Sequence, residues 1–201
     1  MITRTGKDER ARLLRIARQA IEAHVSRQSP VGGQQSAVGS PQAAGRPDDA
    51  EADVIIDRRA GVFVTIYHAG ELRGCIGHIE ADQALQVSVA RCAVAACSED
   101  PRFPAVSASE LPQIQLEISV LGPMEPVAGP SDVEVGRHGL LIEKGRHSGL
   151  LLPQVAAERE WDAAMFLSQT CRKAGLAADG WQHGADVWRF EADVFGDEPA
   201  H

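Results

Sequence analysis

The chain of 201 residues is long enough for one sizeable core, and its 44% hydrophobic and 24% charged residues are typical of a globular protein. Its formal net charge of −8 argues against nucleic-acid binding without sequence preference, which needs cations to neutralise phosphates. No apolar run approaches the roughly 20 residues of a membrane span, and the start of the chain is rich in Lys and Arg without the apolar segment of a secretory signal.

The N-terminal residues 1–27 are expected to contribute one helix to the domain. Apolar residues recur there at helical spacing, namely Leu14, Ala17, Ile21 and Val25. Residues 28–53 combine glycines and prolines with no aromatic side chain, so they cannot bury enough surface to offset the entropy lost on ordering. This segment is predicted to be a disordered insertion, followed by an ordered core over 54–196 and a short tail over 197–201.

A β-hairpin is predicted around Ala69-Gly70, because two β-rich runs flank this turn signal. The register expected for this turn places Val64 opposite Cys75. Because side chains alternate along a strand, Arg73, Cys75 and Gly77 are expected to share one sheet face.

The later elements are expected to be a helix within 82–100, a strand over 114–122, two short strands at 139–145 and 149–155, a helix over 162–174 and a terminal strand over 185–195. Strands joined by hairpins, with helices placed irregularly between them, predict an α+β fold with a mostly antiparallel sheet flanked by helices. Four cysteines without CxxC spacing predict free thiols in the reducing cytosol, and the scattered histidines predict no metal site.

Cys75 is the first candidate functional residue. Gly74 and Gly77 flank it and leave open backbone that a ligand can approach, and Arg73 on the same face would favour the reactive thiolate. The competing interpretation makes Cys75 a small buried hydrophobic residue opposite Val64. Both interpretations stay open from the residues alone.

Arg73 and the turn that contains Asp100 and Arg102 are the other candidates. A guanidinium on a strand needs either a ligand or an internal acid, and Glu80 and Glu117 are candidates for the acid. Glu117, however, lies on the polar face of its own strand, where solvent exposure is the default expectation. Asp100 and Arg102 belong to a proline-rich turn that either caps the helix end or lines a pocket.

The hexapeptide LRGCIG at 72–77 is similar to the signature of the AMMECR domain family. Further segments resemble that family in the same order along the chain: DPRFP, ELPQIQLEISVL, GRHGLLI, GLLLPQVA, WDAAMFLSQTCRKAGL and VWRFEADVF. The resemblance covers nearly all of 54–195 and the N-terminal helix. It implies a larger and a smaller subdomain with a cleft between them and a functional site at the hexapeptide. No established reaction or cofactor comes with it.

Prokaryotic members of this family are called AmmeMemoRadiSam system protein A, which implies a Memo-like protein and a radical-SAM protein as partners. The residues that match the family pattern are Arg73, Gly74, Cys75, Gly77, Asp100, Arg102, Cys171 and Lys173. We therefore expect a cytoplasmic accessory protein that binds a small anionic molecule or a segment of a partner. The alternatives are a thiol-dependent enzyme with Cys75 as nucleophile and Arg73 as its activator, and a scaffold without catalytic activity.

Overall fold

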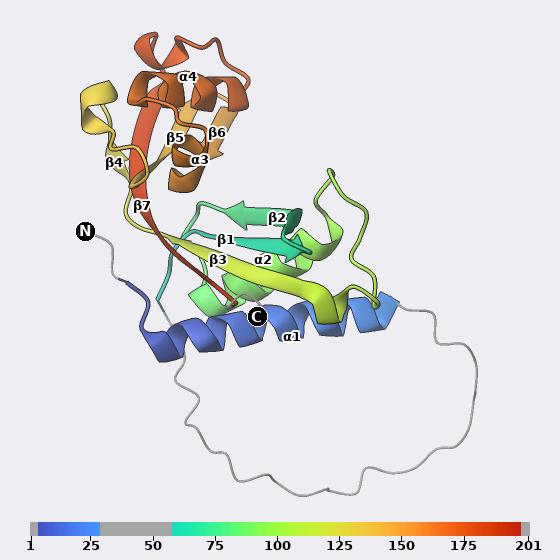
Figure 1. Ribbon diagram of the computed structural model, residues 1–201. Helices are drawn as coiled ribbons and strands as arrows, with labels where there is room; N and C mark the ends of the chain where they lie inside the picture. Colours follow the sequence, from blue (N-terminus) through green and yellow to red (C-terminus); the bar gives the residue numbers. More distant parts are fainter. Residues whose placement is uncertain (1–3, 29–57, 198–201) are drawn as a thin grey trace, which may run out of the picture.

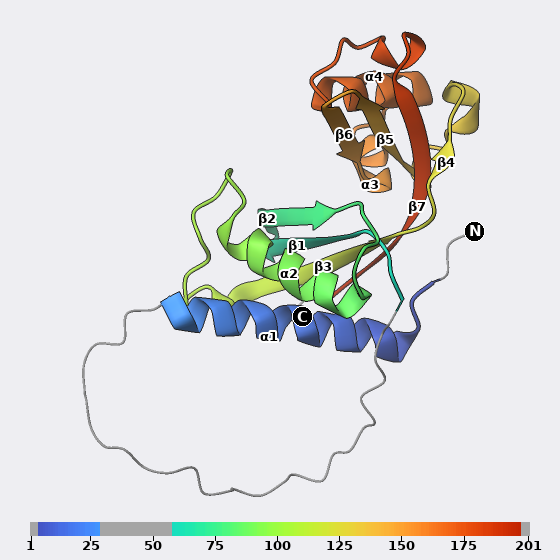
Figure 2. The ribbon, with the colours of Figure 1, turned by 180° about the vertical axis from the view of Figure 1, so that it is seen from behind.

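The computed structural model describes residues 4–28 and 58–197, so the insertion predicted over 28–53 and the tail predicted over 197–201 lie outside the described residues except for Gln28 and Asp197. Two lobes are joined by one long strand (Figures 1 and 2). The large lobe contains α1 (Lys7–Gln28), β1 (Val62–His68), β2 (Glu71–His78), α2 (Leu85–Ser98) and β3 (Ile114–Leu121). The small lobe contains β4 (Glu125–Pro126), β5 (His138–Lys144), β6 (His147–Leu151), α3 (Pro153–Glu158) and α4 (Ala163–Lys173). Short 3-10 turns occupy Leu111–Gln113, Pro130–Asp132 and Gly180–Gln182.

The long strand β7 (Asp186–Gly196) belongs to both lobes. It pairs with β5 through residues 186–191 and with β3 through residues 192–196. The sheet has the order β2-β1-β3-β7-β5-β6, β4 pairs with β7, and the pairings within the described residues are antiparallel. The predicted α+β fold with a mostly antiparallel sheet and two subdomains is confirmed, whereas the cleft between them stays a prediction.

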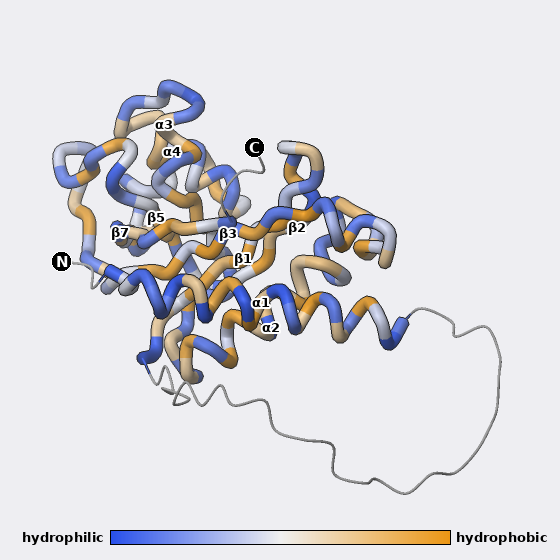
Figure 3. The backbone as a smooth tube through the Cα atoms, turned by 60° about the horizontal axis from the view of Figure 1, so that its bottom comes forward, coloured by the Kyte–Doolittle hydropathy of each residue, from blue (hydrophilic) through white to orange (hydrophobic). Residues whose placement is uncertain are grey.

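Helices α1 and α2 cover one face of β1, β2 and β3 and form the core of the large lobe with them. Hydrophobic and hydrophilic residues alternate along α1, as expected for a helix that buries one side (Figure 3). Its buried positions are Leu13, Ala17, Ile21 and Val25, so Leu13 is buried where Leu14 was expected. Strand β1 directs Val62, Val64 and Ile66 into this core.

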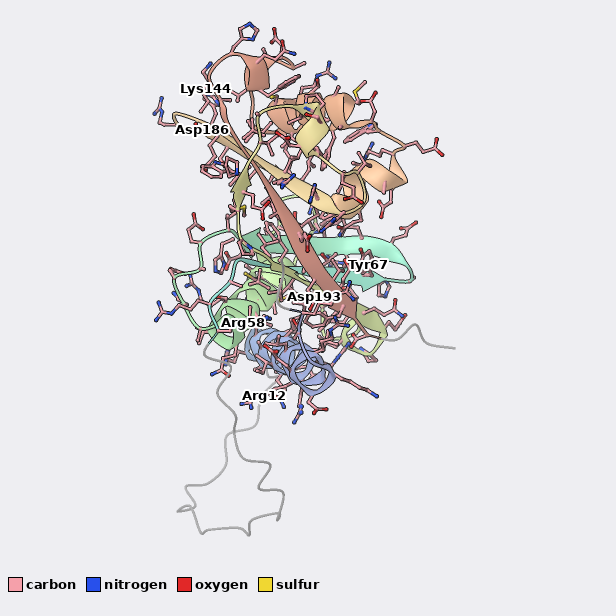
Figure 4. All side chains as sticks on the ribbon, turned by 90° about the vertical axis from the view of Figure 1, so that its left-hand side faces the viewer. Arg12, Arg58, Tyr67, Lys144, Asp186 and Asp193 are labelled. Atoms are coloured by element: carbon pink, nitrogen blue, oxygen red, sulfur yellow. The ribbon has the colours of Figure 1, made fainter. Side chains whose placement is uncertain are left out.

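On the other face of β1, an apolar cluster joins the two lobes. Phe63 packs there against a cluster that includes Leu141 and Phe190 of the small lobe. Asp193, labelled in Figure 4, lies in the part of β7 that pairs with β3. Its carboxylate accepts a hydrogen bond from Arg10 at 2.7 Å and from the Thr5 amide at 2.7 Å. Apolar packing therefore joins the two lobes, whereas the buried carboxylate ties the large-lobe part of β7 to the N-terminal segment.

Two helices of the small lobe lie between β6 and β7 in the chain. Helix α4 follows the prediction: the Asp162 side chain caps its start by accepting from the Met165 amide at 2.7 Å. The short helix α3 differs from the strand expected over 149–155. Pro153 lacks the amide that a strand ladder needs but is well suited to the first turn of a helix, so β6 ends at Leu151. None of the described helices combines the length and apolarity needed to cross a bilayer.

Candidate functional site

The register of the β1–β2 hairpin differs from the prediction after its first pair. An irregularity opposite Tyr67 adds Arg73 as an extra residue to β2, so that Cys75 pairs with Thr65 and the predicted pairing with Val64 is wrong. Thr65 lies on the face of β1 opposite the one that packs against the helices. Cys75 therefore lies on the sheet face turned toward the small lobe.

Arg73 is bound within the large lobe. Its Nε donates to Glu110 Oε1 at 2.7 Å, and Nη1 and Nη2 donate to the carbonyls of Pro104 and Ala105 at 2.7 Å and 3.2 Å. The hydrogen bond from Arg73 is the main reason that the pKa of Glu110 falls to about 2. An internal salt bridge was one of the two interpretations, but its acid is Glu110, which comes from the loop before β3. Arg73 is thus engaged away from the Cys75 thiol.

Gly74 and Gly77 are required by packing within the chain. A Cβ atom on Gly74 would collide with the backbone carbonyl of Ala96 in α2. A Cβ atom on Gly77 would overlap the Phe63 ring. The space beside both glycines is therefore occupied by the protein itself, which explains why glycines stand in a strand where they cost stability.

The Cys75 thiol is half-buried and protonated at neutral pH. Its Sγ accepts a hydrogen bond from the Thr65 hydroxyl at 3.3 Å. Burial raises the pKa of Cys75, although the Thr65 hydrogen bond and the cations of Arg102 and Lys173 act in the opposite direction. Since burial dominates, the thiolate needed for nucleophilic attack is not the resting form.

Asp100 and Arg102 fix the outer edge of β2 beside this thiol. Asp100 Oδ2 accepts the Cys75 amide at 2.8 Å, and Arg102 donates Nε and Nη2 to the two carboxylate oxygens of Asp100 at 2.9 and 2.6 Å. The side-chain hydrogen bond from Arg102 holds the pKa of Asp100 well below its usual range. Asp100 accepts backbone amides, as the structural interpretation of this turn expected, but its partners are Cys75 and Arg102, and the Arg102 side chain binds Asp100 and no helix carbonyl of the described residues. The half-exposed guanidinium of Arg102 is also close enough to lower the pKa of the thiol.

Glu117 and Tyr67 belong to the same sheet face; Glu117 was considered only as an acid for Arg73, and Tyr67 was not considered. Cys75, Thr65 and Glu117 form one row across β2, β1 and β3, because Thr65 pairs with both of the others. Glu117 is half-buried, so its expected solvent exposure was wrong, and burial together with Glu158 of α3 raises its pKa. Burial also raises the pKa of Tyr67, with smaller contributions from Glu117, Cys75 and Glu158.

Lys173 brings a cation from the last turn of α4. Lys173 as a whole residue is exposed. Desolvation of its ammonium group is nevertheless the main reason that its pKa is lowered; Arg102 lowers this pKa further, and the Cys75 thiol acts in the opposite direction. No carboxylate within residues 4–28 and 58–197 forms an ion pair with Lys173. Lys173, which matches the family pattern, thus lies within electrostatic range of Cys75. Cys171, which matches the same family segment, is fully buried in the small-lobe core.

The described residues offer no group of three or more metal-ligating side chains. A cavity of about 520 Å³ lies between α1, α2 and β2, where His78 Nδ1 is 3.3 Å from Cys92 Sγ. Burial raises the pKa of Cys92 to about 11. A second cavity of about 420 Å³ lies against the segments 58–61, 79–81 and 120–124. Cys75 lines neither of these two cavities.

Comparisons with known proteins bear on the family and the fold of the chain. The AMMECR1 family model matches residues 14–195. A protein of Methanothermobacter thermautotrophicus is 43% identical over 200 residues, covering 96% of each chain, and one of Thermococcus gammatolerans is 42% identical over 92% of this chain and 89% of its own. The crystal structure of the uncharacterised protein PH0010 from Pyrococcus horikoshii has a TM-score of 0.76 and 36% identity, covering 92% of this chain and 90% of that one. The chain therefore belongs to the AMMECR1 family.

Proposed function

We propose that this protein is a ligand-binding accessory component, and that a small anionic molecule binds beside Cys75, between Arg102 of the large lobe and Lys173 of the small lobe. The observation that carries this proposal is the unpaired Lys173 ammonium. Lys173 forms no ion pair with a carboxylate of the described residues, and an anionic group is the chemistry that its ammonium would pair with. Arg102, whose guanidinium is paired with Asp100, is a second cation near the same thiol.

A binding role accounts for Cys75 better than nucleophilic catalysis does. Catalytic thiols are activated by a lowered pKa, whereas burial raises that of Cys75. Arg73, the activator in the enzymatic hypothesis, is held by Glu110. In the binding role, the Cys75 thiol provides a neutral contact on the sheet surface. The backbone amide of Cys75 already donates a hydrogen bond to Asp100.

The test is titration of the protein with hexanoate, followed by calorimetry and by the amide NMR shifts of β2. Lys173→Gln removes the cation while keeping a long polar side chain, and affinity is expected to fall about tenfold. Arg172→Gln is the matched control, because Arg172 occupies the neighbouring position of the same helix and is exposed. Binding that is equal in the wild type and in Lys173→Gln, or no binding at all, would refute the proposal.

The partner assignment extends the proposal to a Memo-like protein and a radical-SAM protein, acting together with this chain in a modification pathway in the cytoplasm. Family membership supports it. Co-purification of this chain with both proteins from a host that encodes them is the expected result. Recovery of neither protein under gentle conditions would remove the accessory role and leave the ligand site to be judged by its own test.

A further inference from the structure

Cys92 of α2 and His78 at the end of β2 form a thiol–imidazole pair on the helix side of the sheet, away from the site beside Cys75. The distance from Cys92 Sγ to His78 Nδ1 is 3.3 Å, within hydrogen-bond reach of a sulfur atom. On the other side of the ring, Nε2 is buried without a hydrogen bond to a described residue, and Oδ1 of Asp82 lies 4.0 Å from it. A nucleophile, a base and a group that orients the base occur in this order in thiol and hydroxyl enzymes.

This partner distinguishes Cys92 from the other cysteines. All four cysteines belong to the described residues, and Cys92 is the one with a described imidazole within hydrogen-bond distance. Burial raises the pKa of Cys92 to about 11, so the resting thiol is protonated. Such a thiol resembles a serine hydroxyl, because it needs a base that takes its proton during attack. His78 is placed to be this base, whereas the Cys75 thiol has a hydroxyl donor as its partner.

Both side chains line the cavity of about 520 Å³ between α1, α2 and β2. This volume falls within the roughly 300–1,000 Å³ of small-molecule sites, which combine apolar walls with a few polar groups. Most of the wall consists of small apolar residues from all three elements, namely Ala20, Ala23, Ile76, Gly77, Ala90, Val94 and Ala95. Cys92 is only 3% exposed, so a compact reacting group is required.

The backbone amide of Gly77 adds a hydrogen-bond donor to the same cavity wall. The Cys75 amide donates to Asp100 and not to β1, and alternation along the strand directs the Gly77 amide to the same outer edge. Because β2 is the end strand of the sheet, no further strand of the described chain pairs with this edge. A free amide of this kind can stabilise the oxyanion that forms when a carbonyl is attacked.

We propose that Cys92 is a nucleophile for a small apolar acyl group, which enters this cavity as an ester or thioester. Sγ attacks the carbonyl carbon while the thiol proton passes to Nδ1 of His78, and Asp82 stabilises the imidazolium through Nε2. The proton then moves to the leaving oxygen or sulfur, which departs as an alcohol or thiol, and the acyl group remains on Cys92 as a thioester. Attack of water on this thioester, with the same imidazole as base, releases the acid and restores the thiol.

The experiment treats the full chain with 4-nitrophenyl butyrate and measures nitrophenolate release together with the mass of each cysteine-containing peptide. One butyryl group is expected on Cys92 of the wild type and none in Cys92→Ala. His78→Gln is expected to slow acylation about a hundredfold, and Asp82→Asn about tenfold. The controls are Cys97→Ala, which removes a buried thiol without an imidazole, and Glu80→Gln, which removes an exposed carboxylate; both should react like the wild type.

Thermal unfolding verifies that each variant is folded. The Asp82 side chain is 61% exposed, so Asp82→Asn decides the role of the pair even where His78→Gln fails to fold. Folded wild type without an acyl group on Cys92 would overturn the proposal. Acylation of Cys92 at the wild-type rate in Asp82→Asn and in folded His78→Gln would overturn it as well, because the thiol would then react without the base. The anion site is judged separately by hexanoate binding, which none of these variants is expected to change.

Discussion

Replacement of Arg73 by alanine is expected to destabilise the protein by about 2–3 kcal/mol at neutral pH. The guanidinium donates to Glu110 at 2.7 and 3.3 Å and to the carbonyls of Pro104 and Ala105 at 2.7 and 3.2 Å. Its side chain is only 14% exposed and that of Glu110 23%. Breaking a fully buried pair costs roughly 3–5 kcal/mol, and the remaining exposure of this pair reduces the loss.

The pH dependence gives a second estimate of the same interaction. Hydrogen bonds from Arg73, which contribute most, and from Ser107 lower the pKa of Glu110 from 4.5 to about 2. At roughly 1.4 kcal/mol for each pKa unit, this lowering corresponds to about 3.5 kcal/mol. The share of Arg73, after solvent screening, is about 2 kcal/mol. Because the folded-state pKa is the lower one, this stability is present above pH 4.5 and is lost as the pH falls toward 2.

Urea unfolding of the wild type and of Arg73→Ala, measured from pH 7 down to about pH 3, tests both estimates. The difference in the free energy of unfolding should be largest at neutral pH and should shrink below pH 4.5. Arg15→Ala, at an exposed position of α1, should change stability by less than about 0.5 kcal/mol. An Arg73→Ala protein as stable as the wild type at neutral pH would show that Arg73 is free for a ligand and would refute its structural role as the partner of Glu110.

Three further predictions concern the same hairpin. Gly74→Ala is expected to lower the free energy of unfolding by about 3 kcal/mol, because its Cβ would meet a backbone carbonyl of α2. The control is Gly129→Ala, whose Cβ would meet nothing within 4 Å and which should leave stability nearly unchanged. Thermal unfolding of both variants tests this prediction. The alkylation rate of Cys75 should rise with pH, and the midpoint of this rise should lie above the midpoint for a free thiol, because burial raises the pKa of Cys75. A midpoint below that of a free thiol would favour the enzymatic alternative. Asp100→Asn should lower the free energy of unfolding by about 2 kcal/mol, because it weakens the two hydrogen bonds from the Arg102 guanidinium. Hydrogen exchange of the Cys75 amide, which Asp100 accepts, should become faster. An unchanged exchange rate would contradict the role of Asp100 in fixing the edge of β2.

Local sequence signals were sufficient for most elements of the fold. The helical spacing of apolar residues predicted α1, the turn Ala69-Gly70 predicted the β1–β2 hairpin, and Asp162 marked the start of α4. Each of these signals acts over a few residues, where the periodicity of buried side chains and the chemistry of caps and turns decide the structure. The mostly antiparallel sheet followed from the short connections between strands.

The position of Arg73 could not be predicted, because Arg73 is itself the extra residue of β2 and shifts the register that pairs Cys75 with Thr65. Such a bulge has no distinct sequence pattern in this hairpin, and it reverses which side chains face each other. The partner of Arg73 is Glu110, which is 37 positions away in a loop without regular spacing. Sequence reasoning therefore identified an internal salt bridge as an option but named other acids.

The candidate site was predicted only in part for the same reason. Cys75 and Arg102 stand out in local motifs, whereas Glu117 and Lys173 become relevant only when the two lobes come together. A signal for Glu117 was present, since alternation along β3 puts it on the face opposite the apolar residues. Solvent was assumed to cover that face, and the small lobe lies over it instead (Figure 1).

The pKa of Lys173, measured by NMR on the side-chain nuclei of labelled protein, tests the central claim most directly. In the free protein the pKa should lie below the ordinary value of 10.5, because burial disfavours the ammonium form. Saturating hexanoate should raise it, since a bound carboxylate stabilises that form. A pKa at the ordinary value that does not move with hexanoate would contradict an anion site between the lobes.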